Sequence, residues 1–464
     1  MKIKFIILLV FLICVNQLSV QGQNKNVGNT VNSEACMKLW TRKFQAQIDK
    51  RIERNRKGDV KLEFVDENGD HIKRVSLVVH QKTHEFLFGA NLFVLGQLQT
   101  PQLNSNYENA FKHLFNFATL PFYWRGIEPE EGHLRFKEGS KYIWRRPSPD
   151  NLVDWCKLHN IYIKGHALMY NRDSQMPDWT EQNNSDIFLN QAKKHMREIV
   201  DRYKDNISMW DVVNEERYRT RHPETGNKVP DNYLSWCFRE AGCLFPENVK
   251  LLYNDDTQNH ENPEEYAGYI NDIKSHGLRI DGMGIQFHLF NLKSRDKFLE
   301  GSLYPPNQLM NFYNRMLKLK LPIYVTEITI PSCGENGKII QAKIVENLYR
   351  LWFSIPNMAG ITWWNLGDGT AFKTENKAMA GLLDKEMNPK PAYEVLDRLI
   401  NHEWKTNLSL QTNSKGKVNF RGFYGKYNIE AKYEGETIEK EVNMSKSGDN
   451  HFIITFIVHD KTKK

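Results

Sequence analysis

The chain has 464 residues, of which 40% are hydrophobic and 26% are charged. These proportions are ordinary for a soluble globular protein, and the length allows one large domain with an accessory one, or two to three ordinary domains. The formal net charge of +7 is mild, and both signs are spread along the chain. This distribution excludes the concentrated basic face that nucleic-acid binding requires.

The N-terminus has the features of a secretory signal peptide. Lys2 and Lys4 precede an apolar run, Phe5–Val15, that is too short to span a membrane. The break at Asn16-Gln17 argues against a membrane anchor, and no later segment is apolar enough to cross a bilayer. We therefore expect residues 1–22 to be a signal peptide and the protein to be secreted, extracellular or periplasmic, with no membrane span.

Five cysteines remain after the signal peptide, and an odd number leaves at least one unpaired or intermolecular. Cys237 and Cys243 are the best candidates for a disulfide bond, although a helix there would equally well bury both as thiols. The remaining cysteines are Cys36, Cys156 and Cys333. No Cys-x-x-Cys or Cys/His spacing indicates zinc, and we expect neither a metal nor an organic cofactor.

Both ends of the chain are predicted to form small β-sandwich-like segments. Residues 23–84 contain a charged helix-like stretch and two alternating strands around the turn Glu67-Asn68-Gly69-Asp70, a hairpin signal. Residues 402–464 contain further alternating strands with glycine turns. Whether the two ends are separate modules or one composite sheet stays open at this point.

The middle of the chain, residues 85–401, repeats one pattern eight times. A short apolar stretch is followed each time by polar, helix-capable sequence, which predicts strands alternating with helices and a parallel sheet. Eight units favour the α/β class and a closed (β/α)8 TIM barrel, and no Gly-rich phosphate turn supports an open sheet. The eight predicted strands lie at 86–93, 115–122, 161–169, 208–215, 249–255, 282–289, 322–329 and 359–366.

Polar and aromatic side chains gather where these strands end, at the face that carries the active site in such barrels. Glu215 and Glu327 end the fourth and seventh strands, so they face each other across the barrel mouth. Two facing carboxyl groups form the constellation that cleaves a glycosidic bond. Their separation, about 5–5.5 Å for retention or about 6.5–9.5 Å for inversion, is not a property of the sequence.

At these residues the chain resembles glycoside hydrolase family 10, the retaining endo-β-1,4-xylanases. The resemblance implies that Glu215 is the general acid/base and Glu327 the nucleophile. It also implies a contact by Asn214 at the sugar 2-hydroxyl, Gln286 and His288 around the nucleophile, His166 as a sugar-contacting histidine, and Trp364 as a ring platform. The matching motifs are WDVVNE (210–215), YND (253–255), DGMGIQFH (281–288), VTEI (325–328), GITWW (360–364) and GLLDKEMNPKPAY (381–393).

The chain departs from the family pattern in the part that binds the glycone sugars. Leu120-Pro121-Phe122-Tyr123 stands where the family has glutamate, asparagine and lysine, although Trp124 matches. Tyr170-Asn171 replaces a Trp-His pair, and Phe372 stands for an expected tryptophan. We therefore include Trp124 and Tyr170 among the predicted substrate contacts, with Tyr123 and Arg125 as further candidates.

The leading hypothesis is a secreted, retaining glycoside hydrolase whose partner is a plant or algal polysaccharide or oligosaccharide, with xylan as the default substrate. One alternative is the same chemistry on a different β-linked polysaccharide. Another is a non-catalytic carbohydrate-binding protein on the same barrel, although a binder needs no matched acid and nucleophile. The sequence predicts no oligomeric state.

Overall fold

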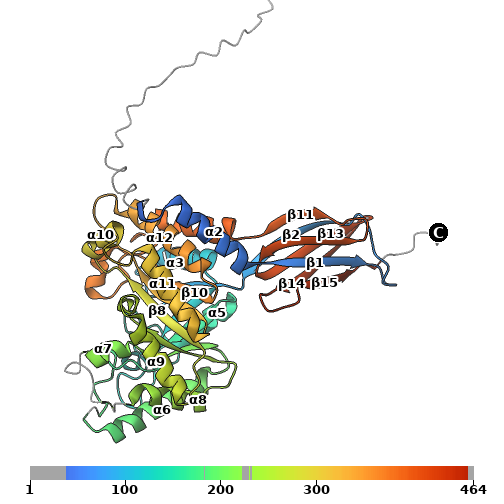
Figure 1. Cartoon of the computed structure of the whole chain (residues 1–464). Helices are drawn as coiled ribbons and strands as arrows, with labels where there is room; N and C mark the ends of the chain where they lie inside the picture. Colours follow the sequence, from blue (N-terminus) through green and yellow to red (C-terminus); the bar gives the residue numbers. More distant parts are fainter. Residues whose placement is uncertain (1–37, 182, 222–228, 230–231, 458–464) are drawn as a thin grey trace, which may run out of the picture.

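Eight parallel strands close into a barrel. With its helices, the barrel lies to one side of the terminal sheets in Figure 1. The computed structural model describes residues 38–181, 183–221, 229 and 232–457. The strand order is β10-β3-β4-β5-β6-β7-β8-β9, so the last strand pairs with the first. The barrel strands are β3 (Leu87–Asn91), β4 (Phe117–Pro121), β5 (Tyr162–His166), β6 (Met209–Asn214), β7 (Lys250–Asp255), β8 (Gly282–His288), β9 (Ile323–Thr329) and β10 (Met358–Trp363). This confirms the predicted (β/α)8 barrel.

The barrel strands are nearly continuous runs of buried residues. Every position of β6 and β9 is buried, because one face points into the barrel interior and the other lies beneath the surrounding helices. All eight predicted strands agree with the observed ones to within about three residues at each end. The apolar runs were therefore sufficient to locate the strands.

Amphipathic helices surround the barrel. In α6 the Asn184 side chain accepts hydrogen bonds from the first-turn N–H groups of Asp186 and Ile187, while Phe188 and Met196 face the core. The helices are α2 (Arg42–Arg56), α3 (Pro101–Leu114), α4 (Trp124–Ile127), α5 (Pro149–Leu158), α6 (Ser185–Tyr203), α7 (Glu216–Arg221), α8 (Tyr233–Leu244), α9 (Pro263–Ser275), α10 (Leu292–Glu300), α11 (Pro306–Met316), α12 (Gly337–Ser354) and α13 (Pro391–Asp397). Four short helical turns are η1 (Thr257–His260), η2 (Leu317–Leu319), η3 (Lys373–Ala378) and η4 (Arg398–Glu403).

The two ends of the chain form one composite pair of sheets, which extends away from the barrel in Figure 1. One sheet has the order β12-β1-β15 and the other β11-β2-β13-β14. They enclose a separate apolar core that includes Leu62, Val79 and Ile429. The strands are β1 (Lys57–Val65), β2 (Ser76–His84), β11 (Asn407–Gln411), β12 (Lys417–Phe423), β13 (Gly425–Tyr433), β14 (Glu436–Met444) and β15 (His451–Thr455). Neither end is a module by itself.

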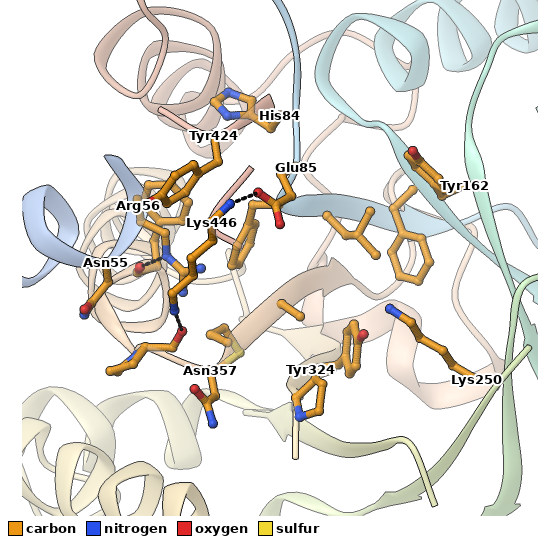
Figure 2. A pocket seen from close by; sticks show the side chains of 18 of the residues that line it. Asn55, Arg56, His84, Glu85, Tyr162, Lys250, Tyr324, Asn357, Tyr424 and Lys446 are labelled. Atoms are coloured by element: carbon orange, nitrogen blue, oxygen red, sulfur yellow. Dashed lines mark hydrogen bonds between the residues drawn. The ribbon is translucent and has the colours of Figure 1, made fainter. Parts of the chain in front are cut away.

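The sandwich meets the barrel at the N-terminal ends of the barrel strands. Figure 2 shows the cavity there, with Arg56, His84 and Lys446 among its lining side chains. The Arg56 guanidinium donates to the carbonyl oxygens of Phe353 and Ile355, both at 2.5 Å. Burial lowers the pKa of Arg56 to about 9. This face lies opposite the carboxyl ends of the strands.

The predicted Cys237–Cys243 disulfide is wrong. Neither residue is part of a disulfide bond; both are thiols on α8, one buried and one exposed. Residues six apart on a helix differ by about 9 Å along its axis, more than the roughly 7 Å between Cα atoms that a disulfide spans. The alternative of helical thiols holds, although only Cys237 is buried.

The predicted signal peptide, residues 1–22, lies outside the described residues. Within the ranges given above, no helix has the length and apolar character needed to cross a membrane.

The buried His84 predicts a pH-dependent stability. Its Nε2–H donates to the Ile400 carbonyl at 2.9 Å, so Nδ1 accepts from Gln81, and burial lowers the pKa from 6.5 to about 4. The unfolded chain protonates this imidazole below about pH 6.5, but the folded chain resists until about pH 4. The contribution of neutral His84 to the free energy of unfolding is therefore fully present above pH 6.5 and is lost as the pH falls towards 4.

Between pH 7 and pH 5, we expect His84 to lower the free energy of unfolding by about 2 kcal/mol. Urea unfolding of the wild type and of His84→Gln at both pH values measures this contribution as the difference between their pH responses. His80→Gln, on the exposed face of the same strand, is the matched control. If the free energy of unfolding fell equally between pH 7 and pH 5 in the wild type and in His84→Gln, this pH dependence would not come from His84.

Candidate active site

A cavity of about 850 Å³ opens at the carboxyl ends of the barrel strands. Glu215 and Glu327 both line it, one directly after β6 and the other within β9. Loops after several strands complete the walls, so residues far apart in sequence meet there. Among the predicted site residues, the lining includes His166, Tyr170, Asn214, Glu215, Gln286, His288, Glu327 and Trp364.

Glu327 is a buried carboxylate that is held in its charged form. Its Oε1 accepts from Asn254 Nδ2 at 3.0 Å and Gln286 Nε2 at 3.1 Å, and Oε2 lies 3.4 Å from His288 Nε2. Burial alone would raise the pKa of this carboxyl. The hydrogen bond from His288 and the positive charges of His166, His288 and Lys164 outweigh burial and lower the pKa below its ordinary value.

Glu215 has a different environment, because it is only partly buried and has both neutral hydrogen-bond donors and a guanidinium nearby. The residue has a positive φ of 56°, a sparsely populated conformation for a non-glycine residue. Its Oε1 accepts from Gln286 Nε2 at 3.1 Å, and its Oε2 accepts from the Tyr170 hydroxyl. Arg172 Nη1 lies 3.6 Å from the same Oε2. Tyr170 therefore contacts the carboxylate directly.

An amide network fixes the positions of both carboxylates. Asn254 Nδ2 also donates to Asn214 Oδ1 at 2.7 Å, and Gln286 Nε2 reaches both glutamates. Gly284 lies against Asn254, since a Cβ at this position would come within 2.6 Å of Asn254 Oδ1. Among the described residues Asn214 Nδ2 has no hydrogen-bond partner, so it is available to a ligand hydroxyl.

Aromatic rings cover one side of the cavity. Trp364, Tyr123, Tyr170 and Phe93 form a small cluster, and the His166 ring packs edge-on against Trp364 with 5.5 Å between ring centroids. The imidazole of His166 is oriented by Asp211, whose Oδ2 lies 2.7 Å from Nδ1. Flat ring faces of this kind suit the apolar faces of sugar rings.

The structure does not bring Trp124 to the cavity. The indole is 2% exposed and stacks on His195 with 4.5 Å between centroids, and its Nε1 donates to Glu128 at 3.1 Å. The side chain lies on α4, whose inner face packs towards α6 rather than towards the mouth. Arg125 also lies outside the lining, because it pairs with Asp178. Of the substitute candidates, Tyr123 and Tyr170 reach the cavity.

Sequence reasoning missed several residues that line the cavity from long loops. Arg145 and Arg146 follow α4, and Arg172 follows β5. The Arg-Arg pair is visible in the sequence, but nothing in its spacing connects it to the strand ends. In the described part of the chain, no group of three or more His, Cys, Asp or Glu residues could hold a metal ion.

Comparison with known proteins identifies the family. The profile of glycosyl hydrolase family 10 matches residues 90–398, which is more than half of the sequence, so the chain belongs to this family. The anti-sigma-I factor RsgI6 of Acetivibrio thermocellus is 24% identical over 392 residues, which make up 84% of this chain and 47% of that protein.

Two endo-1,4-beta-xylanases are also similar. Endo-1,4-beta-xylanase B of Neocallimastix patriciarum is 26% identical over 64% of this chain and 33% of its own length. Endo-1,4-beta-xylanase B of Thermotoga neapolitana is 26% identical over 64% of this chain and 84% of its own length. The chain thus matches half or less of the length of the first two relatives.

Solved structures share the fold. Xylanase 10B of Thermotoga petrophila in complex with xylobiose has a TM-score of 0.54 and 21% identity, covering 69% of this chain and 95% of that one. Native xylanase 10B of Thermotoga maritima has the same score and identity and covers 69% and 96%. At this identity the likeness extends to the barrel architecture.

The environment of Glu327 predicts the acidic limit of activity. Because its pKa is lowered, Glu327 stays ionised at a lower pH than an ordinary carboxyl does. Replacing His288 by glutamine removes a positive charge beside Oε2, so the pKa of Glu327 should rise. We expect the acidic limb of kcat/KM, which reports the free enzyme, to move to higher pH in His288→Gln.

The measurement is a pH profile of kcat/KM on an aryl β-glycoside for the wild type and for His288→Gln. His276→Gln, at the exposed residue that follows the C-terminus of α9, is the control and should leave the acidic limb in place. If the acidic limb of kcat/KM did not move in His288→Gln, or moved equally in the control, His288 would not set the charge state of Glu327.

Proposed function

We propose that this protein is a secreted, retaining glycoside hydrolase that cleaves β-linked glycans of the xylan type, as an endo-β-1,4-xylanase does. The observation that carries the proposal is the Gln286 amide, whose Nε2 donates to one oxygen of Glu215 and one of Glu327, both at 3.1 Å. The two carboxylates therefore face the same small volume of the cavity, where a glycosidic bond can lie between them.

The geometry supports retention rather than inversion. A shared donor limits the separation of the two Oε1 atoms to about 6 Å, which is shorter than the ~6.5–9.5 Å that leaves room for a water in inverting enzymes. The charge states agree, because Glu327 has a lowered pKa and is ready to act as an ionised nucleophile.

The reaction then proceeds in two displacements. Glu327 attacks the anomeric carbon, the bond to the leaving oxygen breaks, and Glu215 donates its proton to that oxygen. Glu215, now ionised, removes a proton from water, and the hydroxide attacks the anomeric carbon. The bond to Glu327 breaks, the β-configuration is restored, and Glu215 is protonated again.

The lining supports the proposed substrate contacts. In this proposal Asn214 Nδ2 donates to the sugar 2-hydroxyl and Trp364 offers a ring face beside the nucleophile, since both residues line the cavity. His166, Gln286 and His288 surround Glu327 and complete this part of the site.

Xylan is the proposed backbone because two relatives are named as endo-1,4-beta-xylanases and a solved neighbour holds xylobiose. Export is proposed from the basic and apolar N-terminus of the sequence.

Removing the nucleophile tests this function. Glu327→Ala should lower turnover of xylan by roughly 10⁴-fold or more while glycan binding persists. Glu215→Ala should lose about 10²–10⁴-fold on xylan but much less on an aryl glycoside whose leaving group needs no proton. NMR of the first product formed by the wild type should show the β-anomer.

Glu216→Gln is the matched control for these variants. Its carboxylate is adjacent in sequence but buried outside the cavity lining, so turnover should change little when folding is intact. An α-anomer as first product would rule out the double displacement. A wild type that binds glycans but releases no reducing ends from any β-glycan would instead identify a carbohydrate-binding protein.

A further inference from the structure

Two adjacent arginines lie in the wall of the cavity without acidic partners. Arg145 is 4% exposed and Arg146 is half-buried, and both line the cavity that holds the carboxylate pair. In the described part of the chain, no carboxylate oxygen lies within 4.0 Å of either guanidinium. The nearest acidic influence on Arg145 is Glu375, which acts only at longer range.

The protein contacts of these arginines are neutral. Arg146 lies over the Tyr123 ring, with 4.2 Å from Cζ to the centroid, and donates to the Arg145 carbonyl at 2.7 Å. Arg145 donates to Asn365 Oδ1 and to the Thr370 carbonyl, while its buried Nε has no partner. Carbonyl groups and ring faces do not cancel a full positive charge. Glu375, which also lines the cavity, offsets part of the charge of Arg145 at longer range, while Arg146 has no ion-pair partner in the described part of the chain.

Burying two neighbouring like charges is costly for a fold. Burial, with the neighbouring charges of Arg145 and Arg135, lowers the pKa of Arg146 to about 10 despite the proximity of Tyr123. Neither residue has an acidic partner that would offset this cost. A purely structural role would be met by neutral donors, which makes a function for the charge the better explanation.

The charge in the cavity is distributed unevenly. The arginines come from the segment after β4, and Glu375 in η3 is the acidic lining residue that acts on Arg145. Asp256 and Glu261 line the cavity from the segment after β7, three strands further around the barrel. Asp256 is already paired with Arg217 at 3.0 Å. The positive end also carries the ring of Tyr123, over which Arg146 lies.

We infer that Arg145 and Arg146 bind an anionic group of the substrate, a carboxylate or a sulfate ester, in the wall of the cavity that holds the carboxylate pair, so that the substrate is an acidic β-glycan. Arg146 is the main contact, because it is accessible from the cavity and its planar fork matches two oxygens of either anion. Arg145 supplies a second charge behind it. This inference deepens the proposed function and rests on it.

Binding to a panel of β-linked glycans tests the inference. Each backbone is offered in a neutral form, a form with uronic acid and a form with sulfate esters, and calorimetry on full-length Glu327→Ala gives the Kd. We expect an anionic form to bind at least tenfold more tightly than its neutral counterpart, or about 1.4 kcal/mol. The advantage should shrink as salt is added. The preferred form identifies the anion as carboxylate or sulfate.

Substitution of Arg146 identifies the residue responsible. In the Glu327→Ala background, Arg146→Gln should remove most of the anionic preference and change neutral binding less than twofold, and Arg146→Lys should keep part of the preference. Arg125→Gln is the matched control, because Arg125 lies nearby on α4 but pairs with Asp178 outside the cavity. Thermal unfolding checks that each variant folds.

Three outcomes would overturn the inference: equal binding of neutral and anionic forms, an Arg146→Gln variant that weakens both forms equally, or no binding to any member of the panel. Reducing-end release by the wild type is measured separately on the same panel. Hydrolysis without anionic preference would leave the proposed function standing and reject only the role of the arginines, whereas absence of any hydrolysis would reject the function.

Discussion

The site depends on keeping one buried carboxylate charged. Glu327 is almost completely enclosed, and an unpaired charge there would be too costly to bury. Amides from β7 and β8 and imidazoles from β5 and β8 offset that cost. The amides and His288 come from the neighbouring strands β7 and β8, whereas His166 comes from β5 and reaches Glu327 across the closed barrel. The closed sheet thus places a reactive anion at a fixed depth.

The junction between the sandwich and the barrel and the cavity with the carboxylate pair lie at opposite ends of the barrel. The composite sandwich joins both ends of the chain and lies against the N-terminal ends of the barrel strands, where Arg56 and His84 are buried. The cavity with the carboxylate pair lies at the opposite end. Changes at the sandwich junction therefore act on stability and its pH dependence, while changes at the mouth act on the reaction.

Much of the fold and the centre of the candidate site could be predicted from local sequence. Apolar runs located all eight strands, and Glu215 and Glu327 stood out because each interrupts such a run. Predictions about which way a side chain points, or which two residues lie close together, were less accurate. Trp124 matches the family motif but points into the core, and the proposed cysteine pair is separated along one helix. Periodicity predicts which residues are buried, but it does not tell which neighbour they face.

The number and order of the barrel strands, and the two carboxylates near the ends of the fourth and seventh, can be predicted from local sequence, because a buried strand is a run of adjacent apolar residues. Other features depend on contacts between distant parts of the chain: the terminal strands form one sandwich, Gln286 joins the two carboxylates, and Arg145 and Arg146 enter the cavity. These contacts join residues many positions apart, so they exist only once the sheet has closed and the loops above it have packed.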